Sequence, residues 1–261
     1  MKKLGLIGYP LTHSFSKKYF EEKFLRENEQ DFSYELFPIE NIEELPALIE
    51  KEKNLVGLNV TTPYKERVLD YLDSMDEVAQ ATQAANCILI SRNENKLKDS
   101  KNKNFILKGF NTDAEGFRYS IKPFLESQHE RALILGTGGA ANAVKYILEN
   151  IGIPCWLVSR THKNDENQYI LHYTELTASI ISQFKLIINA SPVGTFPNQS
   201  HFPQIPYEGI GLGHLAYDLV YNPAETLFLQ KAKANGAVSI NGLSMLYHQA
   251  DEAFKIWKEH A

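Results

Sequence analysis

Two ionisable side chains, Lys65 and Asp113, stand where the sequence predicts the start of a helix, and together such groups can hold and pass a proton. Lys65 ends the polar segment Asn59–Lys65, in which Thr62 would cap a helix and Pro63 would be its first residue. The helix dipole disfavours a cation in the first turn and would weaken its hold on a proton. An exposed helix lysine fits the pattern equally well, because lysine usually has that environment.

Asp113 belongs to the segment Thr112–Glu115, whose capping-box pattern predicts that a helix begins there. The helix dipole stabilises a carboxylate in the first turn, and that effect alone would explain the residue. Placed near Lys65, the same carboxylate would instead orient the ammonium group and bond a substrate hydroxyl. Asn86, at the start of a predicted strand, could add an amide contact.

A second polar segment, Gly8–Ser16, follows the first predicted strand. Its hydroxyls at Ser14 and Ser16 lie at the carboxyl end of that strand, where α/β proteins bind ligands, and could hold a carboxylate. Ser16 could also cap the helix that follows, and the two roles are compatible. We interpret His13 as structural, because nothing beside it in the sequence marks an activated pair.

The segment Leu133–Ala141 has the order strand, GxGxxA turn and helix that is typical of dinucleotide binding. Gly136 would allow the tight turn, Gly138 would let a pyrophosphate approach the backbone, and Ala141 would let the helix pack closely on the strand. The helix start would then offer N–H groups to the phosphates. A simple turn between strand and helix is the alternative.

The next predicted strand leads into Val158–Lys163, where an NAD site usually has an acidic residue that binds the ribose hydroxyl. Ser159 stands there instead, followed by Arg160 and Lys163. A 2′-phosphate would therefore not be repelled, and the planar guanidinium could bind it through two hydrogen bonds. The segment favours NADP over NAD, although Arg160 and Lys163 could also be ordinary surface charges.

Short apolar runs alternate along the chain with longer segments of helical period, which is typical of an α/β fold. The predicted strands are Leu4–Gly8, Phe32–Phe37, Val56–Val60, Ala132–Leu135, Cys155–Val158, Leu186–Asn189 and Ala216–Val220, with a hairpin of Ala85–Ser91 and Phe105–Phe110. The predicted helices are Ser16–Asn28, Ile42–Glu50, Pro63–Leu72, Ala140–Asn150 and Leu243–Glu259, besides the helix at Thr112. Asn93–Lys103 reads as a solvated hairpin tip.

Composition excludes several classes of function. The net charge of -5 and the absence of a long basic run argue against nucleic acid as a partner. Cys87 and Cys155 have no metal-binding or disulfide spacing, so we expect no metal and a reducing, cytoplasmic setting. The short apolar run near Met1 is not interpreted as a signal peptide, and no apolar run is long enough to predict a membrane span.

Taken in order, these segments resemble the shikimate dehydrogenase family over essentially the whole chain. The resemblance is carried by Gly8–Ser16, by Asn59–Lys65 for an Asn-Val-Thr-x-Pro-x-Lys motif, by Asn111–Gly116 for Asn-Thr-Asp-x-x-Gly, by the Gly136–Ala140 turn, and by Asn189–Gly194, Asp218–Pro223 and Gly242–Ala250. It implies an N-terminal α/β substrate-binding catalytic domain (1–112, with the C-terminal helix 242–261 packing back on it), a Rossmann domain for NADP (113–241), and a cleft between them.

The resemblance also implies a role for individual residues. Lys65 and Asp113 would be catalytic. The substrate would be bound by Ser14, Ser16, Asn59, Thr61, Asn86, Tyr221 and Gln249, with Asp113 also on a substrate hydroxyl. The cofactor would be bound by Gly136, Gly138, Gly139, Ala140, Ser159, Arg160, Thr161 and Lys163, with Gly242 and Met245 beside the nicotinamide.

The implied activity is the reversible, NADP-dependent reduction of 3-dehydroshikimate to shikimate, in aromatic amino-acid (chorismate) biosynthesis. We expect a cytoplasmic monomer or homodimer with a small-molecule substrate and no nucleic-acid or membrane partner. Three alternatives remain open: a related polyol dehydrogenase that acts on quinate or uses NAD, a two-domain folate dehydrogenase with a catalytic lysine, and a nucleotide-sensing regulator on the same fold.

The chain departs from the family pattern at several positions, none of which is a predicted catalytic residue. Thr195 stands where methionine is common, which would make the nicotinamide pocket looser or more polar. The other departures are Lys17, Tyr19, Phe20, Ser159 and Asn241.

Overall fold

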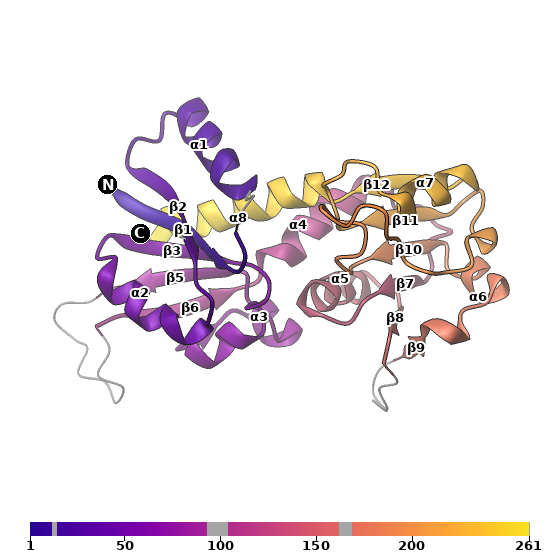
Figure 1. Ribbon diagram of the computed structural model, residues 1–261, viewed down its shortest axis with the longest axis horizontal. Coiled ribbons are helices and arrows are strands. Elements are labelled where there is room, and N and C mark those ends of the chain that lie inside the picture. The colour runs from indigo at the N-terminus through magenta and orange to yellow at the C-terminus, as the bar shows by residue number, and fades with distance from the viewer. Residues whose placement is uncertain (12–14, 93–103, 162–168, 261) are drawn as a thin grey trace. The chain divides into compact units, whose positions relative to one another are not determined.

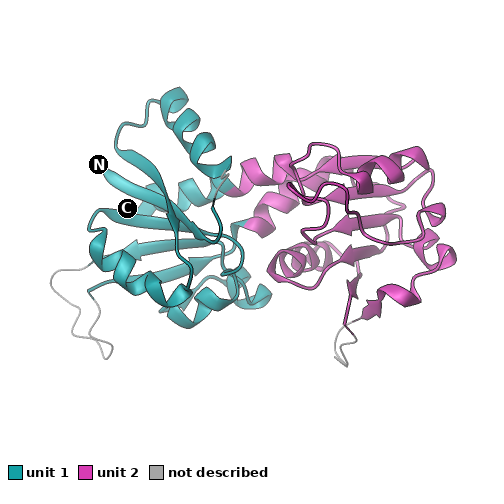
Figure 2. Cartoon of the chain, viewed as in Figure 1, with its two compact units in different colours: residues 1–112, 250–261 teal, residues 113–249 magenta. Residues whose placement is uncertain are grey.

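The structure is a computed structural model that describes residues 1–11, 15–92, 104–161 and 169–260 (Figure 1). It divides into two compact units, each of which is described separately below (Figure 2). Unit 1 comprises Met1–Thr112 and Ala250–Ala261, and unit 2 comprises Asp113–Gln249.

Unit 1 is built on a mixed six-stranded sheet of order β2-β1-β3-β5-β6-β4. β1 pairs in parallel with both β2 and β3, whereas β5 pairs antiparallel with β3 and with β6, which confirms the predicted hairpin. The strands are β1 (Lys2–Gly8), β2 (Phe32–Pro38), β3 (Leu55–Val60), β4 (Ser74–Met75), β5 (Cys87–Ser91) and β6 (Ile106–Phe110).

Alternating side chains of this sheet enter two different cores. Ile88 and Ile90 of β5 belong to a core that also contains residues of α2 (Leu45–Lys51), whereas Cys87 and Leu89 face a core shared with α1 (Phe15–Glu27) and the end of α8 (Leu243–His260). The remaining helical segments of the unit are α3 (Glu77–Thr82) and the 3-10 helices η1 (Ile42–Glu44) and η2 (Arg67–Tyr71).

A glycine lets the C-terminal helix pack directly on the sheet of unit 1. A Cβ at Gly57 of β3 would lie 2.3 Å from Trp257 Nε1, so a side chain there would overlap the indole. Trp257 is fully buried and donates its N–H to Ile88 O at 2.9 Å. The aromatic ring of Trp257 therefore fixes where α8 crosses the sheet.

Unit 2 is built on a fully parallel sheet of order β12-β11-β10-β7-β8-β9. Counted along the chain from β7, this order is 3-2-1-4-5-6, that of the Rossmann fold, which confirms the predicted fold class. The central strands are almost wholly apolar because helices cover both faces of such a sheet. The strands are β7 (Ala132–Leu135), β8 (Cys155–Ser159), β9 (Ile170–His172), β10 (Leu186–Asn189), β11 (Leu215–Asp218) and β12 (Val238–Asn241).

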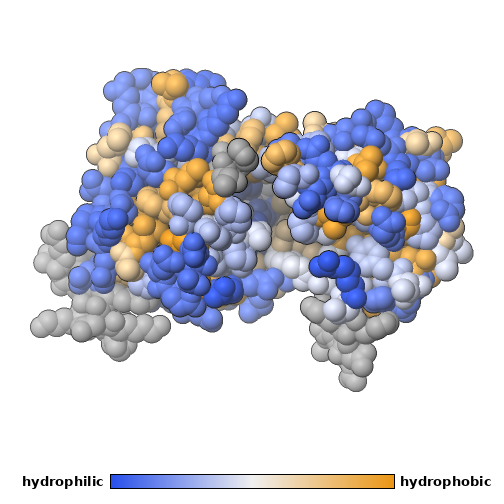
Figure 3. Space-filling view, in the orientation of Figure 1, coloured by the Kyte–Doolittle hydropathy of each residue, from blue (hydrophilic) through white to orange (hydrophobic). Residues whose placement is uncertain are grey.

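The longer helices of unit 2 are amphipathic. In α5 (Gly139–Asn150), Ala141, Val144 and Leu148 lie at helical spacing and are fully buried. The other helical segments are α4 (Thr112–Ile121), α6 (Ala178–Ser182), α7 (Leu227–Ala234), the first part of α8, and the 3-10 helices η3 (Lys122–Phe124), η4 (Tyr173–Glu175) and η5 (Tyr207–Gly209). No described helix is long and apolar enough to cross a membrane. Hydrophilic side chains predominate on the face of the units drawn in Figure 3, with smaller apolar areas between them.

The helix predicted at Pro63–Leu72 is wrong. The residues after Thr62 form turns, and only Arg67–Tyr71 is helical, as a 3-10 helix. The backbone is held by other partners, because Lys65 O accepts from Ala85 N at 2.8 Å. Tyr64 is also fully buried and its hydroxyl donates to Ile39 O. These long-range contacts override the local pattern of a capped helix.

Candidate active site

A buried hydrogen-bond network lies at the ends of the central strands of unit 1. Asn59, near the end of β3, is 5% exposed, and its Oδ1 accepts from the Tyr34 hydroxyl at 2.8 Å. Asn59 Nδ2 donates to Asn86 O at 3.3 Å. Tyr34 is 2% exposed and its ring stacks on Phe20 at a centroid distance of 4.3 Å. The amide of Asn59 is therefore held in one orientation.

Asn86 continues this network to the start of α4. Its Oδ1 accepts from Thr112 N at 2.7 Å, and its Nδ2 lies 3.0 Å from Thr112 Oγ1. Asn111 is tied in the same way, because its Nδ2 donates to Thr82 Oγ1 and to Ala84 O. Asp113 follows Thr112 directly and is only 6% exposed. The network thus fixes the backbone from which the predicted catalytic carboxylate projects.

The capping box predicted at Thr112–Glu115 is wrong, although α4 does begin at Thr112. Thr112 N and Thr112 Oγ1 both bond Asn86 Oδ1, and Glu115 forms an ion pair with Arg118 at 2.5 Å. A tertiary contact therefore replaces the local one. It also ties Thr112 to the residue that precedes β5, which a local cap could not do.

Lys65 lies in a turn between β3 and η2 and is half-buried. The helix dipole expected at its ammonium group is absent, because no α-helix begins at Pro63. The position of the lysine is nevertheless well defined. The buried ring of Tyr64 precedes it, and its own carbonyl is bonded to Ala85 N, one residue before Asn86.

The predicted carboxylate-binding residues are described only in part. Ser14 lies outside the described residues. Ser16 lies inside the first turn of α1, which begins at Phe15, so its predicted place at the helix cap is wrong. Burial raises the pKa of Tyr34 well above its usual value, and a hydrogen bond with Ser16 opposes that shift. Thr61 packs where Gly8 leaves room, since a Cβ on that glycine would lie 2.4 Å from Thr61 Cγ2.

The glycine turn of unit 2 lies at the switch point of the parallel sheet. Gly136 has a φ of +131°, a conformation that favours glycine, and its missing Cβ would lie 3.2 Å from Ala190 C and O after β10. Gly138 precedes α5 with nothing within 4 Å of a Cβ position. The turn is thus open where a phosphate would approach the first N–H groups of α5, among them those of Gly139 and Ala140, so the residues fit a dinucleotide.

The segment after β8 presents the predicted 2′-phosphate residues. Ser159 is 5% exposed and its Oγ accepts from Thr161 N at 3.1 Å, which folds the chain into a tight bend. Arg160 and Thr161 are exposed, and Arg160 O lies 3.0 Å from His172 Nε2 of β9. The carbonyl of Arg160 is anchored and its guanidinium can turn to an anion. Lys163 lies outside the described residues.

The remaining predicted residues lie around the start of α8. Gly242 N donates to Val220 O at 3.3 Å, which places Gly242 beside the segment that carries the half-buried Tyr221. Met245 and Gln249 are 7% and 9% exposed and lie one turn apart. Gly116 of α4 faces them, since its missing Cβ would lie 2.8 Å from Met245 O and 2.9 Å from Gln249 Cβ. This glycine permits the close approach of the two helices within unit 2.

No role was assigned from the sequence to two sets of buried residues that hold neighbouring residues in place. Tyr34 is one, and its only signal is an inward position on β2. The other is the pair Asn189 and Asp218, which end the buried apolar strands β10 and β11 and bond each other at 2.9 Å. Burial raises the Asp218 pKa to about 6. A polar residue that ends a buried apolar strand is a signal that could have found this pair.

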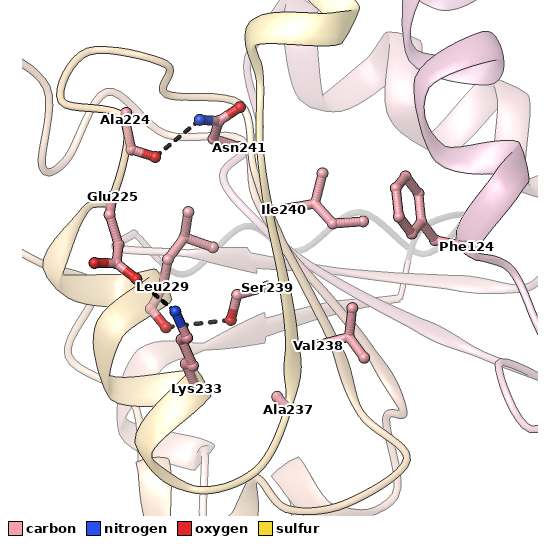
Figure 4. A pocket seen from close by; sticks show the side chains of 10 residues that line it. All are labelled: Phe124, Ala224, Glu225, Leu229, Lys233, Ala237, Val238, Ser239, Ile240 and Asn241. Carbon is pink, nitrogen blue, oxygen red and sulfur yellow. Dashed lines mark hydrogen bonds and ion pairs between the residues drawn. The ribbon is translucent and has the colours of Figure 1, made fainter.

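A hollow of about 540 Å³ lies elsewhere on unit 2, at the β12 edge of the sheet (Figure 4). Phe124 lies on one side of it, and Glu225 and Lys233 of an ion pair lie on the other. None of its lining residues is a predicted site residue, and most of its wall is the strand and its neighbouring helix α7. The site is therefore defined by the strand ends described above.

The parallel sheet with its open glycine turn, in a chain that also carries the polar network beside Asp113, defines a dinucleotide-dependent oxidoreductase with a separate substrate-binding unit. Residues 6–88 match the family model of the shikimate dehydrogenase substrate binding domain. The shikimate dehydrogenase (NADP(+)) of Carboxydothermus hydrogenoformans is 37% identical over 270 residues, or 98% of this chain and 91% of that protein.

Solved structures agree with this match. The chain resembles shikimate 5-dehydrogenase from Thermus thermophilus in complex with NADP(H) and shikimate, with a TM-score of 0.82, 30% identity and coverage of 99% of this chain and 94% of that one. It resembles shikimate dehydrogenase from Aquifex aeolicus with a TM-score of 0.82, 31% identity and coverage of 99% and 93%. The chain belongs to the shikimate dehydrogenase family.

Proposed function

We propose that this protein catalyses the reversible, NADP-dependent reduction of 3-dehydroshikimate to shikimate, in the cytoplasm, for the synthesis of aromatic amino acids. The observation that carries the proposal is the buried network from Tyr34 through Asn59 and Asn86 to Thr112. It fixes two amide side chains and the residue before Asp113, and fixed amides of this kind suit a substrate with several hydroxyl groups.

The substrate is assigned to residues of unit 1 and to Tyr221 and Gln249 of unit 2. Asn59 has two N–H donors, one of which bonds Asn86 O, and the other is suited to a substrate hydroxyl. Thr61, Asn86, Tyr221 and Gln249 are assigned to the remaining polar groups of the substrate. Ser14 and Ser16 are assigned to its carboxylate, because hydroxyl groups can donate hydrogen bonds to an anion.

Lys65 and Asp113 are assigned to the proton. In the direction of reduction, the lysine ammonium donates a proton to the oxygen that becomes a hydroxyl, and in the reverse direction the amine accepts it. The carboxylate of Asp113 is assigned to accept a hydrogen bond from that hydroxyl. Both functions require fixed positions, which the Ala85 N–Lys65 O and Thr112 N–Asn86 Oδ1 bonds provide.

The cofactor is assigned to unit 2. NADP, when bound, supplies or accepts a hydride. Its phosphates are assigned to the Gly136–Ala140 turn, its 2′-phosphate to Ser159, Arg160, Thr161 and Lys163, and its nicotinamide to the neighbourhood of Gly242 and Met245. We propose a substrate domain of 1–112 with 242–261 and a cofactor domain of 113–241, in which residues 242–249, the start of α8, belong to the compact unit 2.

Initial rates of shikimate oxidation, followed by the absorbance of reduced nicotinamide, test the proposal with two variants. Lys65→Met and Asp113→Asn keep the approximate size of each side chain and should lower kcat by about 10²-fold or more, because general acid–base catalysis contributes that much. NADPH binding should stay within about twofold in both. Wild-type rates in either variant would contradict the assigned roles. A folded wild type that binds NADPH without oxidising shikimate would favour a regulator.

A further inference from the structure

Asp218 is a buried carboxylate to which the assigned chemistry gives no role. It ends β11 and is fully buried. The donors to it are neutral: Asn189 Nδ2 and Val220 N bond Oδ1 at 2.9 and 3.0 Å, and the Thr226 hydroxyl bonds Oδ2 at 2.5 Å. Burying a carboxylate without a charged partner is costly, even where neutral donors satisfy its oxygens.

The two carboxylate oxygens of Asp218 serve different segments. Oδ2 accepts a hydrogen bond from the Thr226 hydroxyl. The oxygen of that hydroxyl caps α7 by accepting a hydrogen bond from Leu229 N. Oδ1 faces Asn189, at the end of β10. One oxygen therefore anchors the start of a helix, and the other anchors the end of the neighbouring strand.

Asn189 also forms hydrogen bonds with the loop Ala190–Gly194, and so links that loop to Asp218. Its Oδ1 accepts from Ser191 Oγ at 2.6 Å and from Ser191 N at 3.2 Å, and its Nδ2 also donates to Val193 O. The bond to Asp218, the shorter of the two that Nδ2 makes, helps to set which way the Asn189 amide faces, because a carboxylate oxygen can pair only with its NH₂ end. A reversed amide would turn its NH₂ toward Ser191 N, which is also a donor.

The same loop touches the glycine turn of the cofactor site. Ala190 N donates to Leu135 O at 3.0 Å, and the missing Cβ of Gly136 would lie 3.2 Å from Ala190 C and O. β7 and β10 are the two strands between which the order of the sheet reverses (Figure 1), and a dinucleotide binds at the carboxyl ends of such strands. The loop is thus one wall of the place where the pyrophosphate would lie.

We propose that Asp218 is a positioning residue for the cofactor, which acts through Asn189 to hold the loop Ala190–Gly194 against the glycine turn. It touches neither the cofactor nor the reacting atoms. The proposal rests on the NADP-dependent function proposed above. Loss of Asp218 should weaken cofactor binding and leave the handling of the proton by Lys65 and Asp113 unchanged.

Four variants separate this role from a contribution to stability alone. Asp218→Ala removes both links. Asp218→Asn can keep its carbonyl on Asn189 and Val220 while its NH₂ faces the Thr226 oxygen, so it is the rescuing variant. Ser191→Ala removes the hydroxyl bond between Asn189 and the loop, the shortest of the three, at a half-buried residue. Thr226→Val removes the helix-side bond and the cap on Leu229 N, leaves every bond of Asn189 in place, and is the control.

The readouts are the Kd of NADPH from fluorescence titration, and kcat and both KM values from shikimate oxidation. We expect Asp218→Ala and Ser191→Ala each to raise the Kd about tenfold, with a less than additive effect in the double variant because both act through Asn189. Asp218→Asn should stay within about threefold of wild type, and Thr226→Val within about twofold, at unchanged shikimate KM.

Two results would overturn the proposal: Ser191→Ala with wild-type NADPH affinity, or Asp218→Asn bound as weakly as a folded Asp218→Ala. If Asp218→Ala does not fold, Ser191→Ala still decides the question. A wild type that fails to bind NADPH would instead contradict the proposed function, so the two failures are distinguishable.

Discussion

Removing one hydroxyl group, by Tyr34→Phe, tests whether the buried network positions the substrate. The phenylalanine ring can keep its stacking on Phe20 at 4.3 Å, so packing is preserved. Asn59 Oδ1, in a side chain that is 5% exposed, loses the donor at 2.8 Å. An unsatisfied buried acceptor costs about 2 kcal/mol, which corresponds to a fall in Tm of roughly 4–8 °C for a chain of this size.

The functional consequence should appear in the substrate constants alone. Without the Tyr34 hydroxyl the Asn59 amide can rotate, so the KM for shikimate should rise roughly five- to tenfold while the KM for NADP stays constant. Tyr19→Phe is a matched control, because it removes a phenol bond of unit 1 to Asp251, outside the network. Initial rates and differential scanning calorimetry measure both effects. A lower Tm with an unchanged shikimate KM would refute the positioning argument.

Three further predictions follow from individual contacts. Arg160→Ala should raise the Kd of NADP by about tenfold or more and that of NAD by less than about twofold, because only NADP carries the 2′-phosphate. Titration of each cofactor measures both values, and equal losses of affinity would contradict the assignment. Gly57→Ala should lower the free energy of unfolding by about 2–3 kcal/mol, because its Cβ would lie 2.3 Å from the buried Trp257 indole. Urea titration measures the change, and an unchanged midpoint of unfolding would contradict that packing. The Asp218 pKa of about 6 lies above the usual value of about 3.9, so the native state binds the proton more tightly than the unfolded state does. The stability that this tighter proton binding provides is lost as pH rises through about 4 to 6. Relative to Asp218→Asn, the wild type should lose on the order of 2–3 kcal/mol over that range in unfolding titrations at several pH values, and a constant difference would show that Asp218 keeps an ordinary pKa. In the described part of unit 2, the titratable groups that interact electrostatically with Asp218 are the Tyr207 and Tyr217 phenols, and burial raises the pKa of each, so neither titrates in this range.

The strands of the parallel sheet could be predicted because their signals are local. β7 and β10 have the predicted bounds, and each is an apolar run that is buried on both faces. The glycine turn that follows β7 was predicted for the same reason. β12 was missed because, as an edge strand, it keeps only part of that pattern, and Val238 is 56% exposed.

The region around Lys65 could not be predicted from local rules. Thr62 and Pro63 carry the signal of a helix start, but the backbone after them bonds to Ala85, twenty residues further along the chain. The capping box at Thr112 failed in the same way, since Asn86 takes the N–H that Glu115 was expected to bind. Motif order identified which residues to consider, and tertiary hydrogen bonds determine how they are held.

The central claim is that this chain oxidises shikimate with NADP. The most direct measurement compares four pairs in one absorbance assay: shikimate or quinate, each with NADP or NAD. The account predicts fast reduction of NADP by shikimate, and at least about tenfold lower kcat/KM with NAD, because the 2′-phosphate contacts favour NADP. With either cofactor, shikimate should be turned over faster than quinate. Preferred turnover of quinate, or preference for NAD, would contradict the account.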